Sequence, residues 1–392
     1  MPAIEMYELL SVGLVILLGI LGGKLSHRYK IPRVTGYMLT GLLFGPSVLG
    51  LISSSTLESI HMINDIALGL ILFTIGGEID LHKLRTSARK MISVTLAESS
   101  GSMILVFLAV WAITQDVGLA LLLGGVSIAT APGVTLLVTR EYRARGPLTE
   151  SLLAVVALNN VLCLLGFRLF FAFYSMTEGT ELITIVATLG KELIGAAVFG
   201  LAIGAMITYW EQKIDDLSEL LLVIIGGILA GIGLAKTMGI SYMIVCLVIG
   251  AVTNNLSAVH RLIHAELRQT EMPFYIAFFV LSGASLHIDS LAHLGIIGAA
   301  YMIVRPIGKY IGARWSCSKL GVETSVKENL GMALLPQAGV AIGMVIAVSE
   351  THPELGAVMS TVILSSVIVY EGIGPFLTRL SLKRAGEIHL QE

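Results

Sequence analysis

Residues 129–133, Ala-Thr-Ala-Pro-Gly, interrupt one long apolar stretch of this chain, and residues 335–339, Leu-Pro-Gln-Ala-Gly, interrupt another. A broken helix in a bilayer leaves backbone carbonyls and amides that hydrocarbon cannot solvate, so such breaks persist only where protein or a polar cavity satisfies them. Two breaks at corresponding positions of two halves predict a secondary transporter whose binding site lies where the half-helices meet.

The composition places the chain in a membrane. Of its 392 residues, 55% are hydrophobic and 13% are charged, whereas soluble domains carry roughly 25% charged residues. We therefore expect a polytopic protein embedded in a lipid bilayer. The net charge of −2 predicts no nucleic-acid partner. The three cysteines lack metal-ligand spacing, and no nucleotide loop or catalytic constellation is evident. We expect no metal, no cofactor and no enzymatic activity.

Apolar runs predict an all-α fold with about 13 transmembrane helices. They fall near residues 7–24, 32–50, 59–79, 90–113, 117–140, 148–175, 184–210, 217–236, 239–254, 272–288, 291–314, 326–349 and 355–378.

The positions of the basic residues predict the orientation of the chain. If the N-terminus lies outside, nearly all lysines and arginines between the runs fall in cytoplasmic loops, and Lys236 alone falls in an opposite loop. Cytoplasmic loops carry this bias in membrane proteins. We expect a multi-pass protein of the plasma (inner) membrane with its C-terminus in the cytoplasm. Too little sequence follows Lys383 to fold, so we expect no soluble regulatory domain.

The two breaks lie on the fifth and twelfth predicted helices, an odd offset that orients them oppositely in the membrane. This arrangement predicts an inverted repeat with the breaks crossing near the midplane. The adjacent Asn159 and Asn160 fall about halfway along the sixth helix, and their buried amides need partners. The unwound backbone at 130–133 could supply those partners. Our candidate ion- or substrate-binding residues are Thr130, Ala131, Pro132, Asn159, Asn160 and Gln337.

Several short motifs, taken together and in order, give the chain a resemblance that covers nearly its whole length. It resembles the monovalent cation:proton antiporter family 2, in its Kef-like branch, which has the sodium/proton exchanger fold. The motifs are residues 36–46 (GYMLTGLLFGP), 72–78 (LFTIGGE), 129–132 (ATAP), 140–149 (REYRARGPLT) and 308–312 (GKYIG).

The resemblance implies monovalent cation (sodium or potassium)/proton antiport by a homodimer that uses elevator-type alternating access. It implies a dimerisation scaffold at about 1–85 and 217–288. A mobile core would occupy about 88–175 and 291–382, and a linker helix about 184–210.

The chain departs from this family at Asn160. The family carries an asparagine or aspartate followed by aspartate at these two positions, and that final aspartate exchanges the cation for protons. An amide can coordinate a cation but cannot titrate. Three explanations remain open. The coupling acid lies elsewhere; the protein is uncoupled from protons or carries another small solute; or an Asp-to-Asn change has trapped an ordinary antiporter.

Four ionisable residues within predicted helices are candidates for charge pairing or proton coupling. Lys309 matches a family lysine, and a lysine buried without a counter-charge loses its proton more readily. Arg305, one helical turn earlier, stays charged and can only bind or hold a partner. Glu98 is a candidate replacement acid, or it pairs with Arg89 or Lys90 near the interface.

Glu371 lies near the middle of the last predicted helix. An ionisable residue at membrane depth is a functional candidate by default, and Gly372, Gly374 and Pro375 indicate local unwinding beside it. The alternative is that Glu371 pairs with Lys309 or Arg305.

Overall fold

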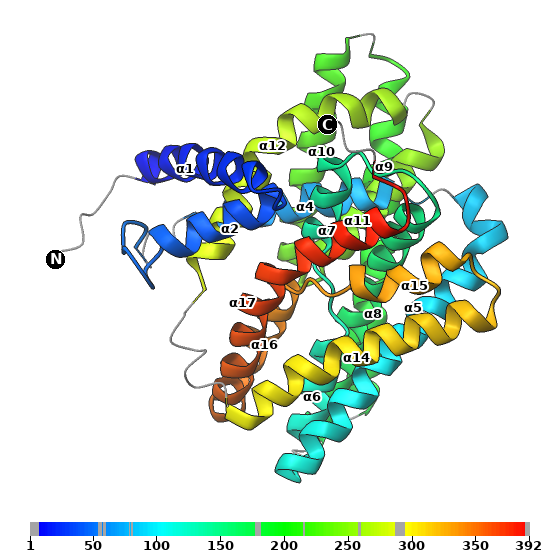
Figure 1. The fold of residues 1–392 in the computed structure, drawn as a ribbon. Coiled ribbons are helices and arrows are strands. Elements are labelled where there is room, and N and C mark those ends of the chain that lie inside the picture. The colour runs from blue at the N-terminus through cyan, green and yellow to red at the C-terminus, as the bar shows by residue number, and fades with distance from the viewer. Residues whose placement is uncertain are drawn as a thin grey trace.

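The computed structural model describes residues 8–53, 57, 60–77, 79, 81–176, 182–214, 216–257, 260–286 and 295–388, and Glu78 of the second motif lies outside them. The elements in these residues are all α-helices (Figure 1). They are α1 Glu8–Arg28, α2 Arg33–Phe44, α4 His61–Gly77, α5 Leu81–Thr114, α6 Val117–Ser127, α7 Pro132–Glu141, α8 Pro147–Met176, α9 Leu182–Glu211, α10 Leu217–Met238, α11 Tyr242–Leu256, α12 His260–Ala284, α14 Gly295–Lys319, α15 Thr324–Ala333, α16 Gly339–Thr351 and α17 Pro353–Arg384.

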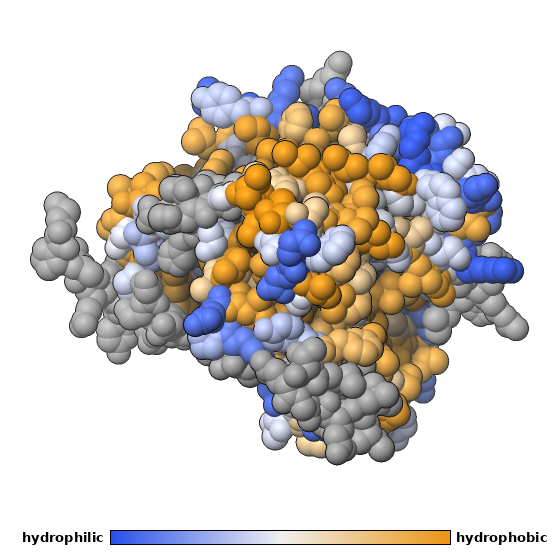
Figure 2. All heavy atoms as spheres, turned by 90° about the horizontal axis from the view of Figure 1, so that it is seen from below, coloured by the Kyte–Doolittle hydropathy of each residue, from blue (hydrophilic) through white to orange (hydrophobic). Residues whose placement is uncertain are grey.

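The helices confirm the predicted all-α membrane architecture. Each apolar run coincides with one helix, or, at the two breaks, with the pairs α6–α7 and α15–α16. Within the described residues, 7 stretches are long and apolar enough to cross a membrane, and further apolar helices are shorter. The count of 13 crossings stays a prediction. Large apolar side chains cover much of the surface, which suits contact with lipid (Figure 2).

The helices pack into two bundles. We call α5–α8 with α14–α17 the site bundle, because it contains both breaks. We call α1, α2, α4 and α10–α12 the second bundle, and α9 packs on it along α10 and α11 while touching α8. In Figure 1 the long helices α5 and α14 lie side by side.

Small residues allow α5 and α14 to approach closely. A Cβ on Gly312 would lie 2.3 Å from the Ala97 carbonyl oxygen, and one on Gly308 would lie 2.5 Å from the Gly101 carbonyl oxygen. Such contacts are typical of helix pairs in membranes, where small residues let backbones meet. Lys309 follows Gly308 on α14 and Glu98 follows Ala97 on α5, so the two side chains face each other across the helix pair.

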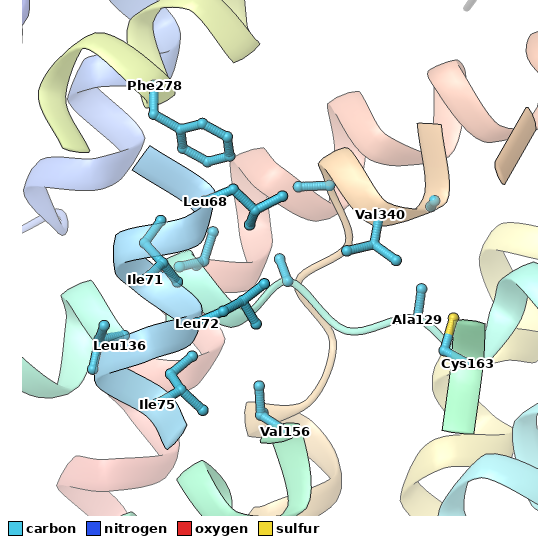
Figure 3. Packing of buried hydrophobic residues seen from close by; sticks show 14 of the residues in the cluster. Leu68, Ile71, Leu72, Ile75, Ala129, Leu136, Val156, Cys163, Phe278 and Val340 are labelled. Atoms are coloured by element: carbon cyan, nitrogen blue, oxygen red, sulfur yellow. The ribbon is translucent and has the colours of Figure 1, made fainter. Parts of the chain in front are cut away.

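The surface between the two bundles is apolar over much of its area. On α4, Ile71, Leu72 and Ile75 are fully buried, and Figure 3 shows them close to residues of the site bundle such as Leu136 and Val156. We call this surface the seam. Around these residues apolar side chains pack against each other, and the ion pairs that α7 makes with the second bundle lie at its C-terminal end.

Polar contacts cross the seam beside the end of α7. The Arg140 guanidinium lies 2.6 Å from a carboxylate oxygen of Glu271 on α12, which also accepts a hydrogen bond of 2.6 Å from Thr74 on α4. The neighbouring Glu141 carboxylate accepts a hydrogen bond from the Arg33 backbone N–H at 2.8 Å. These contacts tie the site bundle to the second bundle at one end of the seam.

The segment after α17 folds back onto the start of α8. The buried Glu387 carboxylate accepts hydrogen bonds from the backbone N–H groups of Leu148 and Thr149 at 2.6 and 2.7 Å, and from the Thr149 hydroxyl at 2.6 Å. A carboxylate at a helix N-terminus satisfies free amides and complements the helix dipole. Gly146 is required beside it, because its φ is +151° and a Cβ there would lie 2.5 Å from the carboxyl carbon.

Candidate functional site

The two helix breaks lie against each other in the middle of the site bundle. Pro132 occupies the first turn of α7, where its missing N–H costs nothing, and Ala131 precedes it with an extended backbone. The Ala131 N–H donates a hydrogen bond of 2.8 Å to the Pro336 carbonyl oxygen of the second break. The Thr130 hydroxyl donates to the Leu334 carbonyl oxygen at 3.3 Å. The breaks therefore cross, as the pattern of prolines and glycines predicts.

Arg305 holds both breaks at once. It is fully buried on α14, and its guanidinium donates hydrogen bonds to the carbonyl oxygens of Ser127, Ala129 and Leu335 at 3.0, 2.6 and 2.9 Å. These oxygens are freed where α6 and α15 end, and the C-terminal ends of helices attract cations. Its guanidinium also stacks on the Tyr370 ring, 4.5 Å from the centroid.

Gln337 is a second connector between the breaks. Its side-chain amide donates hydrogen bonds to the Val126 carbonyl oxygen at 3.0 Å and to the Tyr301 hydroxyl at 2.9 Å, and the residue is fully buried. The sequence predicts a site amide here. In this conformation Gln337 stabilises the contact between the two breaks, because protein groups accept both of its amide hydrogens.

Lys309 and Glu98 form a buried ion pair beside the crossing. The ammonium nitrogen lies 2.8 Å from a Glu98 carboxylate oxygen, and both side chains are fully buried. The same nitrogen donates to the Ile128 carbonyl oxygen at 2.9 Å and to the Thr130 hydroxyl oxygen at 3.1 Å. All three ammonium protons thus have partners, which a buried lysine needs.

The alternative pairing of Glu98 with Arg89 or Lys90 is wrong. Both basic residues are exposed, whereas Glu98 points into the bundle toward Lys309. The close approach of α5 and α14 explains the difference, since it carries this part of α5 away from the surface.

The Asn159 side chain extends the ion pair toward α8. Its amide nitrogen lies 2.5 Å from the other Glu98 carboxylate oxygen and 3.2 Å from the Ser99 hydroxyl oxygen. The Asn160 amide nitrogen donates to the Val156 carbonyl oxygen one turn back, at 2.8 Å. The amide oxygens of both asparagines are buried and accept no hydrogen bond from any described residue.

The unwound backbone at 130–133 does not supply the partners of the two asparagines, contrary to expectation. Carbonyl oxygens near this break bind the Lys309 ammonium and the Arg305 guanidinium instead. A cation outcompetes a neutral amide for a carbonyl, because charge-assisted hydrogen bonds are roughly twice as strong. The consequence is that Asn159 turns to Glu98.

Glu371 is buried in α17 with 1% exposure, and neither of its carboxyl oxygens has a hydrogen-bond partner among the described residues. The alternative ion pair with Lys309 is wrong, because Lys309 binds Glu98. An ion pair with Arg305 is also wrong in this conformation, since the guanidinium binds carbonyl oxygens. Glu371 and Gly374 both lie inside continuous helix, so the expected unwinding around Glu371 is wrong too.

The comparison with protein families decides where this architecture belongs. The model of the transmembrane sodium/hydrogen exchanger family matches residues 13–379, which includes both breaks and every site residue described above. The chain belongs to the sodium/hydrogen exchanger family. The Kef-like branch within this wider group stays a prediction.

The relatives of this exchanger-family chain share little sequence identity with it, but they match it over most of its length. It is 23% identical over 372 residues to the ammonium/H⁺ antiporter subunit AmhT of Alkalihalophilus pseudofirmus, covering 92% of this chain and 91% of the relative. It is 20% identical over 340 residues to the Na⁺/H⁺-K⁺ antiporter GerN of Bacillus cereus, covering 85% of each. The family and these relatives are transporters, which confirms the prediction of a membrane transporter rather than an enzyme.

The fold of this exchanger is also that of a solved antiporter. The sodium proton antiporter MjNhaP1 of Methanocaldococcus jannaschii superimposes with a TM-score of 0.74 at 17% identity, covering 97% of this chain and 96% of that one. At this identity the match shows the fold alone. It confirms the predicted sodium/proton exchanger fold.

Two residues that contact the site, Tyr301 and Ser99, were not predicted from the sequence. Tyr301 lies one turn before Arg305 and two turns before Lys309, so all three occupy one stripe of α14. Ser99 adjoins Glu98 on α5, and its hydroxyl oxygen accepts a hydrogen bond from the Asn159 amide of α8. The spacing of these polar residues was a usable signal, because one polar face on an apolar helix must be satisfied by a neighbour.

Proposed function

We propose that this chain exchanges a monovalent cation, sodium or potassium, for protons across the plasma (inner) membrane. We further propose that it works as a homodimer, with its N-terminus outside and its C-terminus in the cytoplasm. Membership of the exchanger family supports the transport of cations and protons. The observation that carries the proton coupling is the Glu98–Lys309 ion pair beside the crossing, because it supplies ionisable groups where Asn160 supplies none.

Lys309 is the group that exchanges the proton in this scheme. A cation that binds the Glu98 carboxylate takes the place of the ammonium, and the lysine then lies buried without a counter-charge. Burial without a counter-charge favours the neutral amine, so Lys309 releases its proton to solvent. When the cation leaves, the amine regains a proton and restores the ion pair. One proton at Lys309 is exchanged for one cation at Glu98.

Oxygen atoms around Glu98 suit a monovalent cation. The amide oxygens of Asn159 and Asn160 accept no hydrogen bond within the described chain, and each is buried. The Thr130 hydroxyl and the carbonyls of the breaks add neutral oxygens. Exchangers with broken helices coordinate coupling ions with such oxygens. We propose Glu98, Asn159, Asn160 and Thr130 as the cation ligands, with Ala131, Pro132 and Gln337 holding the crossing open to them.

We propose an elevator-type movement in which the site bundle is the mobile core and the second bundle, with α9 as linker, is the dimerisation scaffold. The apolar part of the seam around Ile71, Leu72 and Ile75 supports this, because no charges have to separate there when the two bundles slide. The Arg140–Glu271 ion pair must break in that movement. This ion pair would therefore stabilise the present arrangement of the two bundles.

The test is cation-driven proton movement in proteoliposomes that contain a pH-sensitive dye. Sodium, potassium and ammonium gradients are each imposed on the unmodified protein, Glu98→Gln and Glu219→Gln. Glu219 is an exposed carboxylate of the second bundle, so its variant controls for the loss of any acid. We expect exchange in the unmodified protein and the control and none in Glu98→Gln. Exchange retained by Glu98→Gln would refute the displaced acid.

The runner-up is an exchanger-fold transporter that is uncoupled from protons or carries another solute, or one trapped by an Asp-to-Asn change. Asn160 favours it, because its amide cannot titrate at the position where the family uses aspartate. An Asn160→Asp variant separates the two. Exchange in that variant alone would support the trapped form. Exchange in the unmodified protein supports Glu98 and Lys309.

A further inference from the structure

Glu371 is a buried acid that the exchange at Glu98 and Lys309 leaves unused. It shares a face of α17 with Gly374, where a Cβ would lie 2.9 Å from the Pro336 ring, and with Thr378, whose hydroxyl donates to the Ala333 carbonyl oxygen at 3.2 Å. Glu371 therefore lies beside the second break, one helical turn from Gly374.

The surroundings of Glu371 contain one cation that acts on it. The helices packed against α17 are α2, α6, α7, α14, α15 and α16. Among described side chains, their ionisable residues are Arg33, Tyr37, Arg140, Glu141, Tyr301, Arg305, Lys309, Tyr310, Arg314, Cys317, Lys319, Lys327 and Glu328, and Tyr370 is adjacent on α17 itself. Of these, Arg305 comes near this turn of α17, because its guanidinium lies 4.5 Å from the ring centroid of the adjacent Tyr370, and its charge favours an ionised Glu371.

The absence of partners fixes the protonation state of Glu371 in this conformation. A buried carboxylate without a hydrogen bond or an ion pair costs many kcal/mol, whereas a neutral carboxyl without a partner costs about 1–3 kcal/mol. Arg305 cannot offset the larger cost here, because its guanidinium is bound to three carbonyl oxygens. Glu371 is therefore a neutral carboxylic acid when Arg305 holds the breaks.

We infer that Glu371 is a second proton-binding site of the transport cycle, and that Arg305 switches it by moving from the break carbonyls to the Glu371 carboxylate. This inference rests on the proposed exchange. It also explains why a carboxyl stands at this position. A side chain that stayed neutral throughout would be replaced without loss by glutamine.

Competition for carbonyl oxygens would drive the switch. The cation bound at Glu98 also competes for the neighbouring break carbonyls that Arg305 now holds, and a guanidinium keeps its charge in any protein environment. Once displaced from a carbonyl, Arg305 needs an anion, and Glu371 is the adjacent acid on α17. The O–H bond of Glu371 breaks, its proton passes to solvent, and the carboxylate pairs with the guanidinium.

The charge balance of the cycle follows from these steps. One cation enters while one proton leaves Lys309 and a second proton leaves Glu371. The exchange therefore moves one net charge per cycle. Without the Glu371 step the exchange would be one-for-one and electrically silent.

The experiment counts protons and cations in the same proteoliposomes, using radiolabelled sodium or rubidium uptake and a calibrated pH dye. The proteins are the unmodified chain, Glu371→Gln and Glu371→Asp. Glutamine keeps the shape of the neutral acid and removes its proton, whereas aspartate keeps a titratable group. We expect two protons per cation in the unmodified protein, one in Glu371→Gln, and recovery toward two in Glu371→Asp. Steady transport current should disappear only in Glu371→Gln.

Several outcomes would overturn the inference. A ratio of one in the unmodified protein refutes it without any variant. An unchanged ratio in Glu371→Gln refutes it as well, as does a folded Glu371→Gln protein that transports nothing. A loss of exchange in Glu98→Gln together with an unchanged ratio in Glu371→Gln would leave the proposed function standing and remove only the second proton. No exchange by the unmodified protein with either tracer would overturn both.

Discussion

Replacing one member of the Glu98–Lys309 pair should lower the stability of the folded protein much more than replacing both members together. Both side chains are fully buried with 2.8 Å between the charged atoms. Removing one member of such a pair leaves an uncompensated charge and costs about 3–5 kcal/mol, whereas replacing both members is often close to neutral. We therefore expect Glu98→Gln and Lys309→Gln each to be strongly destabilised, and the double variant to recover most of the loss.

The expected size of this effect is within reach of a thermal melt. Unfolding entropy scales with length, so a chain of 392 residues has an unfolding entropy of about 0.8 kcal/mol/K. A loss of about 3–5 kcal/mol then lowers Tm by about 4–6 °C. Tryptophan fluorescence of the detergent-solubilised protein measures this shift.

A surface pair supplies the matched control. Lys327 lies 3.6 Å from a Glu328 carboxylate oxygen, and both side chains are partly exposed. Pairs of this kind contribute about 0–1 kcal/mol, so Lys327→Gln should leave Tm within about 1 °C of the unmodified protein. Equal shifts for Lys327→Gln and Lys309→Gln, or additive losses in the Glu98/Lys309 double variant, would contradict the buried pair.

Other contacts give further predictions. Arg140→Gln strands the fully buried Glu271 carboxylate, so Tm should fall by about 4–6 °C in the same melt. Gly312→Ala forces α5 and α14 apart, and size-exclusion chromatography should show aggregated protein, whereas Gly226→Ala, with open space at its Cβ, should stay monodisperse. Glu387→Ala frees two amides at the start of α8 and should cost about 1–3 kcal/mol; an unchanged Tm would mean that the cap contributes nothing.

The sequence predicts the two breaks and the helices well, because each depends on local pattern. Pro132 and Pro336 mark the two breaks whatever surrounds them. Which charged side chains pair with each other does not depend on local pattern alone. The position of Glu98 along α5 gives its depth in the membrane, but its partner depends on how closely α5 approaches α14. Gly312 permits the close approach by contacting Ala97, which is far away in the sequence.

The asparagines illustrate the same limit. Their depth in α8 was predictable, yet their partners were decided by competition between Lys309, Arg305 and the amides for the same few carbonyl oxygens. Which donor wins depends on charge and distance at once. Sequence pattern shows neither, although the polar stripe through Tyr301, Arg305 and Lys309 on α14 shows which helix face must be satisfied.

The return of Glu387 to the start of α8 makes the end of the described chain a mechanical attachment point. Tension applied beyond residue 388 would reach α8 through three hydrogen bonds made by Leu148 and Thr149, and α8 carries Asn159 and Asn160. A force on a purification tag or fused reporter placed directly after this segment would therefore act on the helix that carries both asparagines. A flexible spacer of glycine and serine would remove that load, because such a linker transmits little force until it is fully extended.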